Sequence, residues 1–241
     1  MIKSSNPALN ENIFREVAGT DSSTMTIQGT VNKTGILLAL VMAAGAITWN
    51  MGYASFPLMI LGGIAGFVLA LITVFKKTAA PITAPLYAVA QGLFLGGISW
   101  TFERQYPGIV TQAVGLTFGT LFCLLGAYKS GYIKVTENFK LGLVAATGGI
   151  MIFYFVTFIL GLFGVPLTII HGNGLFSIGF SMVVVVIAAL NLVMDFDFIE
   201  SGAEQGAPKY MEWYGAFGLM VTLIWLYIEI LRLLAKLRSR D

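Results

Sequence analysis

Long apolar runs dominate the chain and constrain its fold more than any other feature. A transmembrane helix needs roughly 20 apolar residues, and these runs are long and lack the alternation typical of strands. The sequence therefore predicts an all-α membrane protein, a bundle of seven transmembrane helices in a lipid bilayer. The runs lie at about Thr34–Met51, Phe56–Phe75, Ala84–Phe102, Ile109–Tyr128, Leu141–Phe163, Leu175–Met194 and Tyr214–Ala235.

Composition excludes several other classes of protein. Only 11% of the 241 residues are charged and the net charge is +2, whereas soluble domains carry about 25% charged residues. This excludes a soluble enzyme with a membrane anchor, and we expect no nucleic-acid partner. The single cysteine, Cys123, excludes an intramolecular disulfide. The sequence contains no cluster of metal-ligand residues, phosphate-binding glycine loop or Ser-His-Asp set, so we expect neither enzymatic chemistry nor a cofactor.

Two regions differ in polarity. Residues 1–33 form a polar N-terminal tail, and residues 34–241 form the transmembrane domain. Within the tail, Asn6-Pro7 is a typical start for a short helix that would end near Val17. Residues 20–32 are rich in Thr, Ser and Gly, which predicts an extended or irregular segment.

Lysine and arginine predict the orientation, because positive residues favour the cytoplasmic side. They gather in the tail and in the connections after the second and fourth runs, at Lys3, Arg15, Lys33, Lys76, Lys77, Lys129, Lys134 and Lys140. The intervening connections hold only Arg104. We therefore expect a cytoplasmic N-terminus. If the last run crosses the membrane fully, the basic C-terminal end lies outside, in disagreement with the rule. We expect a full crossing, and the alternative is that the last run enters the membrane and returns to the same side.

Three pairs of glycines lie four residues apart within the apolar runs: Gly62/Gly66, Gly92/Gly96 and Gly115/Gly119. Small residues at this spacing let helix backbones approach closely in lipid. We expect these faces to pack tightly within one chain, and the alternative is a dimerisation face.

Acidic residues in or beside an apolar span are costly in lipid and usually functional. Asp195 and Asp197 end the sixth run, and at two residues apart on a helix they point about 200° away from each other. They cannot share a proton by themselves. We expect Asp195, which lies on the face of Asn191, to point into the bundle. The alternative is that both belong to the solvated end of a helix.

Glu229 lies within the seventh run, and Arg232 follows at i+3, within pairing reach. The structural interpretation is an internal salt bridge whose arginine extends toward the membrane surface. The functional interpretation is a carboxylate on an ion or proton path.

Several stretches carry a resemblance to a known family. They are Ser4–Leu9, Thr26–Gly35, Ala84–Ala88, Gly92–Ser99, Met194–Glu200 (MDFDFIE) and Gly206–Leu219 (GAPKYMEWYGAFGL). In these stretches the chain resembles the Bax inhibitor family of multi-spanning membrane proteins, specifically its bacterial Bax inhibitor/YccA-like branch. The resemblance extends over nearly the whole chain and implies the inner (plasma) membrane of a bacterial cell.

The resemblance also implies a seven-helix bundle with the last helix at its centre. It implies a pH-sensitive calcium leak controlled by proton-dependent pairing of two aspartates. Asp195 matches the first aspartate. The stretch expected to hold the second, Leu219–Leu223, has no acid and includes Thr222, so the two-aspartate pairing cannot operate here as it does in the family.

The leading hypothesis is a leak for calcium or another cation, gated by Asp195, which would also be the candidate calcium ligand. Its expected partner is Arg232 or Lys209, and Asp197 and Glu229 are further candidates for pH sensing or the ion path. The alternative is an interaction protein that modulates a membrane protease or a stress response without transport.

Overall fold

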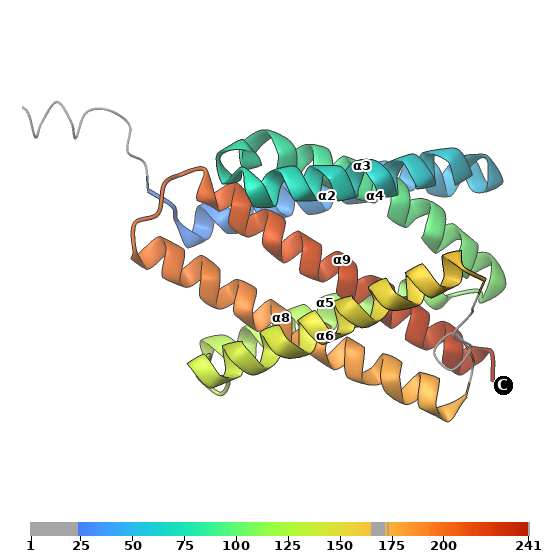
Figure 1. Ribbon diagram of the computed structural model, residues 1–241. Helices are drawn as coiled ribbons and strands as arrows, with labels where there is room; N and C mark the ends of the chain where they lie inside the picture. The colour runs from blue at the N-terminus through green and yellow to red at the C-terminus, as the bar shows by residue number, and fades with distance from the viewer. Residues whose placement is uncertain (1–23, 165–171, 173, 241) are drawn as a thin grey trace, which may run out of the picture.

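The computed structural model describes residues 24–164, 172 and 174–240. In this part of the chain every regular element is helical, which confirms the all-α prediction (Figure 1). The elements are α2 (Ile27–Met51), η2 (Gly52–Ser55), α3 (Phe56–Phe75), η3 (Lys77–Ala79), α4 (Ala80–Gln105), α5 (Ile109–Lys129), α6 (Glu137–Leu162), α8 (Leu175–Glu204) and α9 (Met211–Arg238). The helix predicted between Asn6 and Val17 lies outside the described residues.

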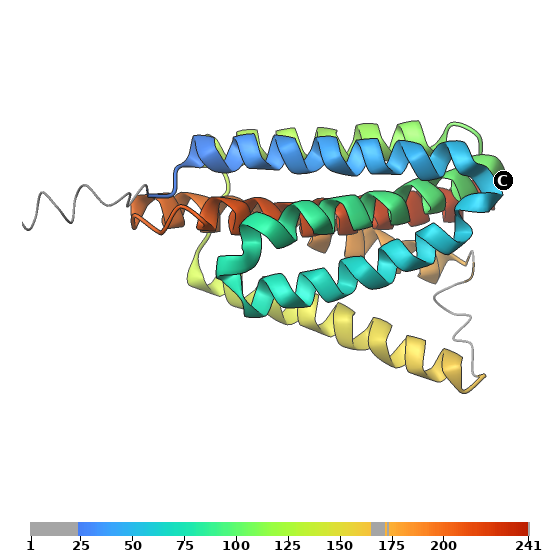
Figure 2. The same cartoon turned by 90° about the horizontal axis from the view of Figure 1, so that it is seen from above.

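Six helical segments of the described residues are long and apolar enough to span a membrane, where the sequence predicted seven. The difference lies at Ile27–Phe75, a 49-residue segment that contains the first two predicted spans. They are not separated by a loop, because the connection Gly52–Ser55 is itself a turn of 3-10 helix. Gly52 has a φ of 57°, which glycine adopts readily. The chain reverses at this turn, and α3 runs antiparallel to α2 (Figure 2).

The start of α2 corrects a second expectation. Residues 27–32 were predicted to be extended or irregular, but they form the first part of α2. The helix starts there because the Thr26 hydroxyl accepts a hydrogen bond of 2.9 Å from the Gly29 N–H. Such a cap satisfies a backbone donor that has no partner inside the helix.

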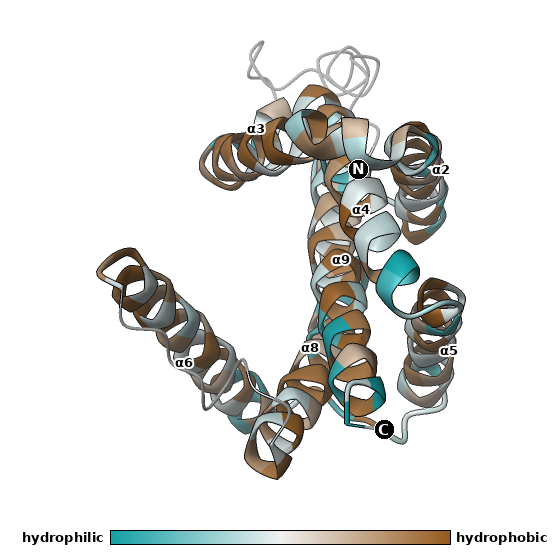
Figure 3. Cartoon of the chain, turned by 90° about the vertical axis from the view of Figure 1, so that its right-hand side faces the viewer, coloured by the Kyte–Doolittle hydropathy of each residue, from teal (hydrophilic) through white to brown (hydrophobic). Residues whose placement is uncertain are grey.

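α9 lies at the centre of the bundle (Figure 3). It packs against α2, α4, α5 and α8, whereas α3 packs mainly on α4, and α6 mainly on α8. The central position predicted for the last helix therefore holds, with α2, α4, α5 and α8 packed most closely around it; α6 reaches it through Tyr154. Buried side chains occupy much of its length, including Met220, Leu226 and Leu231, which are 1%, 0% and 1% exposed.

Two of the three glycine pairs bring helices together. A Cβ at Gly62 would lie 2.5 Å from the Ala90 carbonyl oxygen, so α3 approaches the backbone of α4 there. A Cβ at Gly92 would lie 2.5 Å from the Val41 carbonyl oxygen and 2.7 Å from the Ala44 Cβ, so α4 approaches α2 in the same way. The third pair, Gly115/Gly119 on α5, has no atom of the described residues within 4 Å of either Cβ position. Only the first two pairs therefore fulfil the expectation of packing within the chain.

We predict that Gly92→Ala destabilises the protein by about 1–3 kcal/mol, because the added methyl must push α2 and α4 apart. Gly115→Ala is the matched control. Its methyl meets open space, and alanine is favoured over glycine in a helix interior by roughly 0.5–1 kcal/mol. Thermal unfolding in detergent measures both, and equal midpoints for the two variants would contradict this account of the packing.

Candidate functional site

Asp195 points into the seam between α8 and α9, as the sequence analysis expected. A Cβ at Gly218 of α9 would lie 3.8 Å from the Asp195 Oδ1 atom. The Thr222 side chain, one turn further along α9, also faces the Asp195 carboxylate. Thr222 belongs to the stretch where the resemblance implies a second aspartate. The seam therefore contains one carboxylate and a hydroxyl opposite it, rather than two carboxylates.

The carboxylate of Asp195 is only partly satisfied. Its Oδ2 atom is buried and has no hydrogen-bond partner among the described residues. The sequence analysis expected Lys209 or Arg232 to pair with it, and this expectation is wrong, because Lys209 pairs with Glu212 and Arg232 with Glu229. A buried polar atom without a partner is costly. Asp195 can therefore gain a proton, water or a cation without breaking an ion pair.

Asp197 points elsewhere, as the spacing of two residues requires. Its Oδ2 atom lies 3.0 Å from the Lys140 Nζ atom at the start of α6, and Lys140 also approaches Glu137 at 3.5 Å. Glu200, one turn beyond, accepts a hydrogen bond from the Tyr128 hydroxyl of α5. Asp197 therefore belongs to the ion pairs at the end of the bundle, on a different side of α8 from Asp195.

Glu229 and Arg232 form the predicted i,i+3 pair. The carboxylate of Glu229 is 2% exposed, and its Oε1 atom lies 3.1 Å from the Arg232 Nη1 atom. The Tyr154 hydroxyl of α6 lies 3.1 and 3.2 Å from the two oxygens. The Arg232 side chain is 43% exposed and lines a hollow of about 480 Å³ between α6 and α9. Glu229 lies about 10 Å along α9 from Thr222, at 1.5 Å per residue, so it does not share a site with Asp195.

Glu212 is the residue that the sequence analysis missed. It lies in the first turn of α9 and its side chain is fully buried. Its Oε1 atom accepts hydrogen bonds of 2.9 Å from the Thr26 N–H and hydroxyl. It also forms ion pairs with Lys33, and with Lys209 at 2.9 Å. A Cβ at Gly29 would overlap the carboxylate, so glycine is needed there.

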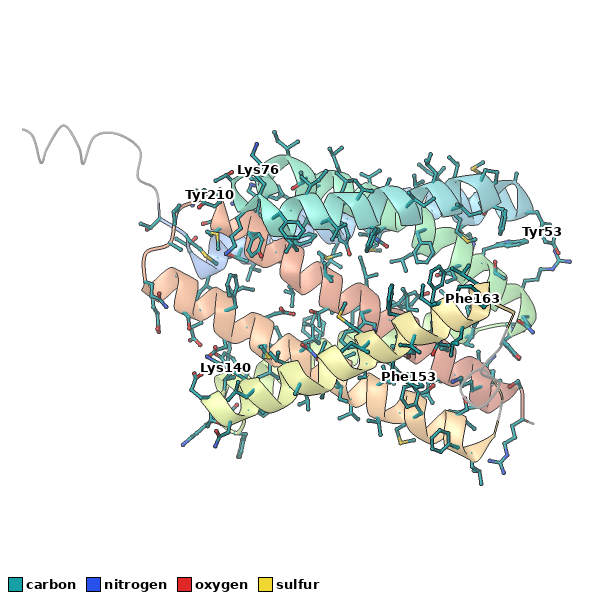
Figure 4. All side chains as sticks on the ribbon, viewed as in Figure 1. Tyr53, Lys76, Lys140, Phe153, Phe163 and Tyr210 are labelled. Atoms are coloured by element: carbon teal, nitrogen blue, oxygen red, sulfur yellow. The ribbon has the colours of Figure 1, made fainter. Side chains whose placement is uncertain are left out.

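Glu212, Thr26, Lys33 and Lys209 together form what we call the Glu212 cluster. It holds the start of α2 against the start of α9. We call the end of the bundle that contains it the Gly206 end, which lies at the left in Figure 4 with Tyr210, Lys76 and Lys140 labelled. The spacing of Lys209 and Glu212 was visible in the sequence, but Lys33 is 179 residues away from Glu212. Only the folded chain brings these charges together.

The site offers few ligands for a metal ion. Among the described residues, no three His, Cys, Asp or Glu side chains come together to hold one. A calcium ion takes six to eight oxygen ligands. At Asp195 the ligands from the protein would be its carboxylate and the Thr222 hydroxyl, with water supplying the rest. This arrangement suits a passing cation better than a firmly bound one.

Comparison with known proteins gives a family match over nearly the whole chain. The family model described as Bax inhibitor 1 like matches residues 6–239. Searches of curated proteins and of solved structures found no match.

We predict that Glu212→Gln lowers the free energy of unfolding by about 3 kcal/mol, because it leaves the largely buried Lys33 ammonium group, whose side chain is 16% exposed, without its counter-charge. The control is Glu137→Gln, which removes an exposed carboxylate beside Lys140 and should leave the unfolding midpoint nearly unchanged. Thermal melts of both variants in the same detergent measure the difference, and an unchanged midpoint for Glu212→Gln would refute the role given to the cluster.

Proposed function

Because the chain belongs to the Bax inhibitor 1 like family, we propose that it is a pH-sensitive cation leak in which Asp195 responds to protons. Calcium is the cation to test first. The observation that supports this most directly is the Asp195 Oδ2 atom, buried in the α8–α9 seam with no hydrogen-bond partner in the described part of the chain. A carboxylate placed in this way changes its charge without disrupting the ion pairs that hold the fold together.

The proposed mechanism uses the cost of a buried charge. While Asp195 is ionised, the closed seam holds a negative charge that lacks a counter-charge, which favours a state in which water and cations reach it. When Asp195 is protonated, the neutral group fits a dry seam, and its oxygens can exchange hydrogen bonds with Thr222. The flux of cations therefore falls as the pH falls. This switch needs one carboxylate and not two.

We also propose seven crossings of a bacterial inner membrane, with the Gly206 end in the cytoplasm. The helices α2 and α3 have 25 and 20 residues, and each is long enough to cross a bilayer alone. Lysines gather at the Gly206 end, where Figure 4 shows Lys76 and Lys140, and positive residues favour the cytoplasmic side. The C-terminus then lies outside, although Lys236 and Arg238 near it are positive residues of the kind that favours the cytoplasmic side.

The leak is tested by calcium flux into proteoliposomes at mildly acidic and mildly alkaline pH. We expect a wild-type flux that rises with pH, and a flux through Asp195→Asn that is the same at both pH values. Asp197→Asn is the matched control. Its carboxylate pairs with Lys140, so its removal should keep the pH dependence.

Glu229→Gln belongs in the same series, because the sequence analysis makes Glu229 a further candidate for the ion path. Its carboxylate pairs with Arg232, so its removal should keep the pH dependence. A pH-dependent flux that survives Asp195→Asn would overturn the mechanism. If the wild type shows no flux above that of empty liposomes at either pH, the leak is refuted and the alternative of an interaction protein without transport is favoured.

Seven crossings predict which positions meet the outer medium. In a Cys123→Ser background, we expect Tyr53→Cys to react with a membrane-impermeant maleimide on intact cells, and Lys76→Cys to react only after lysis. Tyr53 lies in the turn between α2 and α3, at the opposite end of the bundle from Lys76 (Figure 4). Labelling of both cysteines from the same side would show that Ile27–Phe75 does not cross twice.

A further inference from the structure

We propose that Met25 closes the Gly206 end of the α8–α9 seam and thereby controls access to Asp195. The proposal deepens the proposed function and depends on it for its consequence on flux. The occlusion of Asp195 can be tested without any transport.

Met25 is held in place by a short segment, Thr24–Thr26, which we call the N-terminal strap. Thr24 forms an isolated antiparallel bridge with Pro208 in the connection between α8 and α9. The Met25 N–H donates a hydrogen bond of 2.7 Å to the Ala207 carbonyl oxygen. Thr26 donates two hydrogen bonds to the buried Glu212 carboxylate. The strap therefore lies across the end of the seam and is bonded along its whole length.

The Met25 side chain enters the seam itself. It is 2% exposed. Its sulfur lies 3.0 Å from the Cβ position of Gly202 on α8, and its terminal methyl lies 3.5 Å from that of Gly215 on α9. Both helices have a glycine at the contact, which leaves room for the thioether between them. Met25 is thus a wedge between α8 and α9, with one glycine on each side.

The wedge lies on the Gly206 side of Asp195, one turn away counted along α9 and two turns away counted along α8, where Gly202 follows Asp195 by seven residues. On α9, Gly215 contacts Met25, and Gly218, three residues later, faces Asp195. On α8, Ile199 follows Asp195 by four residues and lies 3.2 Å from the Cβ position of Gly215. Three residues of helix correspond to roughly 4.5 Å. Met25 and Ile199 together cover the carboxylate from that end.

The chemistry of methionine suits this role. Its flexible thioether fills irregular gaps and is only a weak hydrogen-bond acceptor. It offers nothing that replaces the hydration of a carboxylate or a cation. While the strap is in place, water and ions cannot reach Asp195 from this end. When Met25 leaves, Gly202 and Gly215 have no side chains to fill the space that the thioether occupied.

The test is the chemical accessibility of Asp195 in the full-length protein in proteoliposomes. A water-soluble carbodiimide adds to an accessible carboxyl group to form an O-acylisourea. The amine of added glycine methyl ester then attacks the acyl carbon, which forms an amide and releases a urea. Peptide mass spectrometry then gives the modified fraction of Asp195. We expect Met25→Ala to raise this fraction several-fold over the wild type. Glu137, whose side chain is 84% exposed, serves in every sample as the internal reference for reagent access.

Two further variants separate a wedge from general loosening. Met182→Ala removes a 53% exposed methionine from α8 itself and should leave the labelling of Asp195 at the wild-type level. Met25→Leu fills a similar volume and should keep Asp195 protected. Labelling of Met25→Ala at the wild-type level would overturn the proposal. Labelling of Met25→Leu as strong as that of Met25→Ala would also overturn it.

Calcium flux then connects the wedge to the leak. We expect Met25→Ala alone to raise the calcium flux several-fold over the wild type. In the double variant Met25→Ala/Asp195→Asn, we expect the flux to be the same at both pH values. Raised labelling with no flux from any variant refutes the leak and supports the wedge. A pH-dependent leak with unchanged labelling supports the leak and refutes the wedge.

Discussion

The Glu212 carboxylate is the interaction on which the arrangement of the helices at the Gly206 end depends. It lies at the first turn of the central helix α9 and binds Thr26, Lys33 and Lys209 at once. Because charges are strongly destabilised in an apolar surrounding unless they are paired, this carboxylate cannot leave its partners at low cost. It therefore holds the start of α2 against α9. Through Thr26 it also holds the N-terminal strap over the end of the α8–α9 seam.

In the described part of the chain, three acidic side chains that face the interior of the bundle differ in their environments. Glu212 has two lysines and two hydrogen-bond donors, and Glu229 has Arg232 and the Tyr154 hydroxyl. Asp195 has Thr222 opposite it and one oxygen without a partner in the described part of the chain. A fully paired carboxylate stabilises one arrangement of helices, whereas a partly satisfied one favours different arrangements in its two protonation states. This contrast assigns structural roles to the first two and the role of a switch to Asp195.

The glycines of the apolar runs also have unequal roles, which their spacing could not distinguish. Gly62 and Gly92 allow backbone contacts between α3, α4 and α2. Gly115 has the same spacing to its partner but faces no atom of the described residues. Spacing determines that two small residues share a helix face. It does not determine which helix, if any, lies against that face, because this depends on how the other helices fill the space around α9.

The sequence by itself determined the all-α class, the approximate positions of the spans and the opposite directions of Asp195 and Asp197. These follow from local properties, namely the length of apolar runs and the 3.6-residue repeat of a helix. It also identified the pair of Glu229 and Arg232, because two residues that are three positions apart on a helix lie next to each other on its surface.

Only the tertiary structure decided which charges meet across long sequence separations. It joined Lys33 to the Glu212 carboxylate, 179 residues away, and placed Met25 between Gly202 and Gly215. It also placed Thr222 opposite Asp195. The physical reason is that a helix repeat fixes where a side chain points on its own helix, whereas the contact that it makes depends on the packing of helices far apart in the chain.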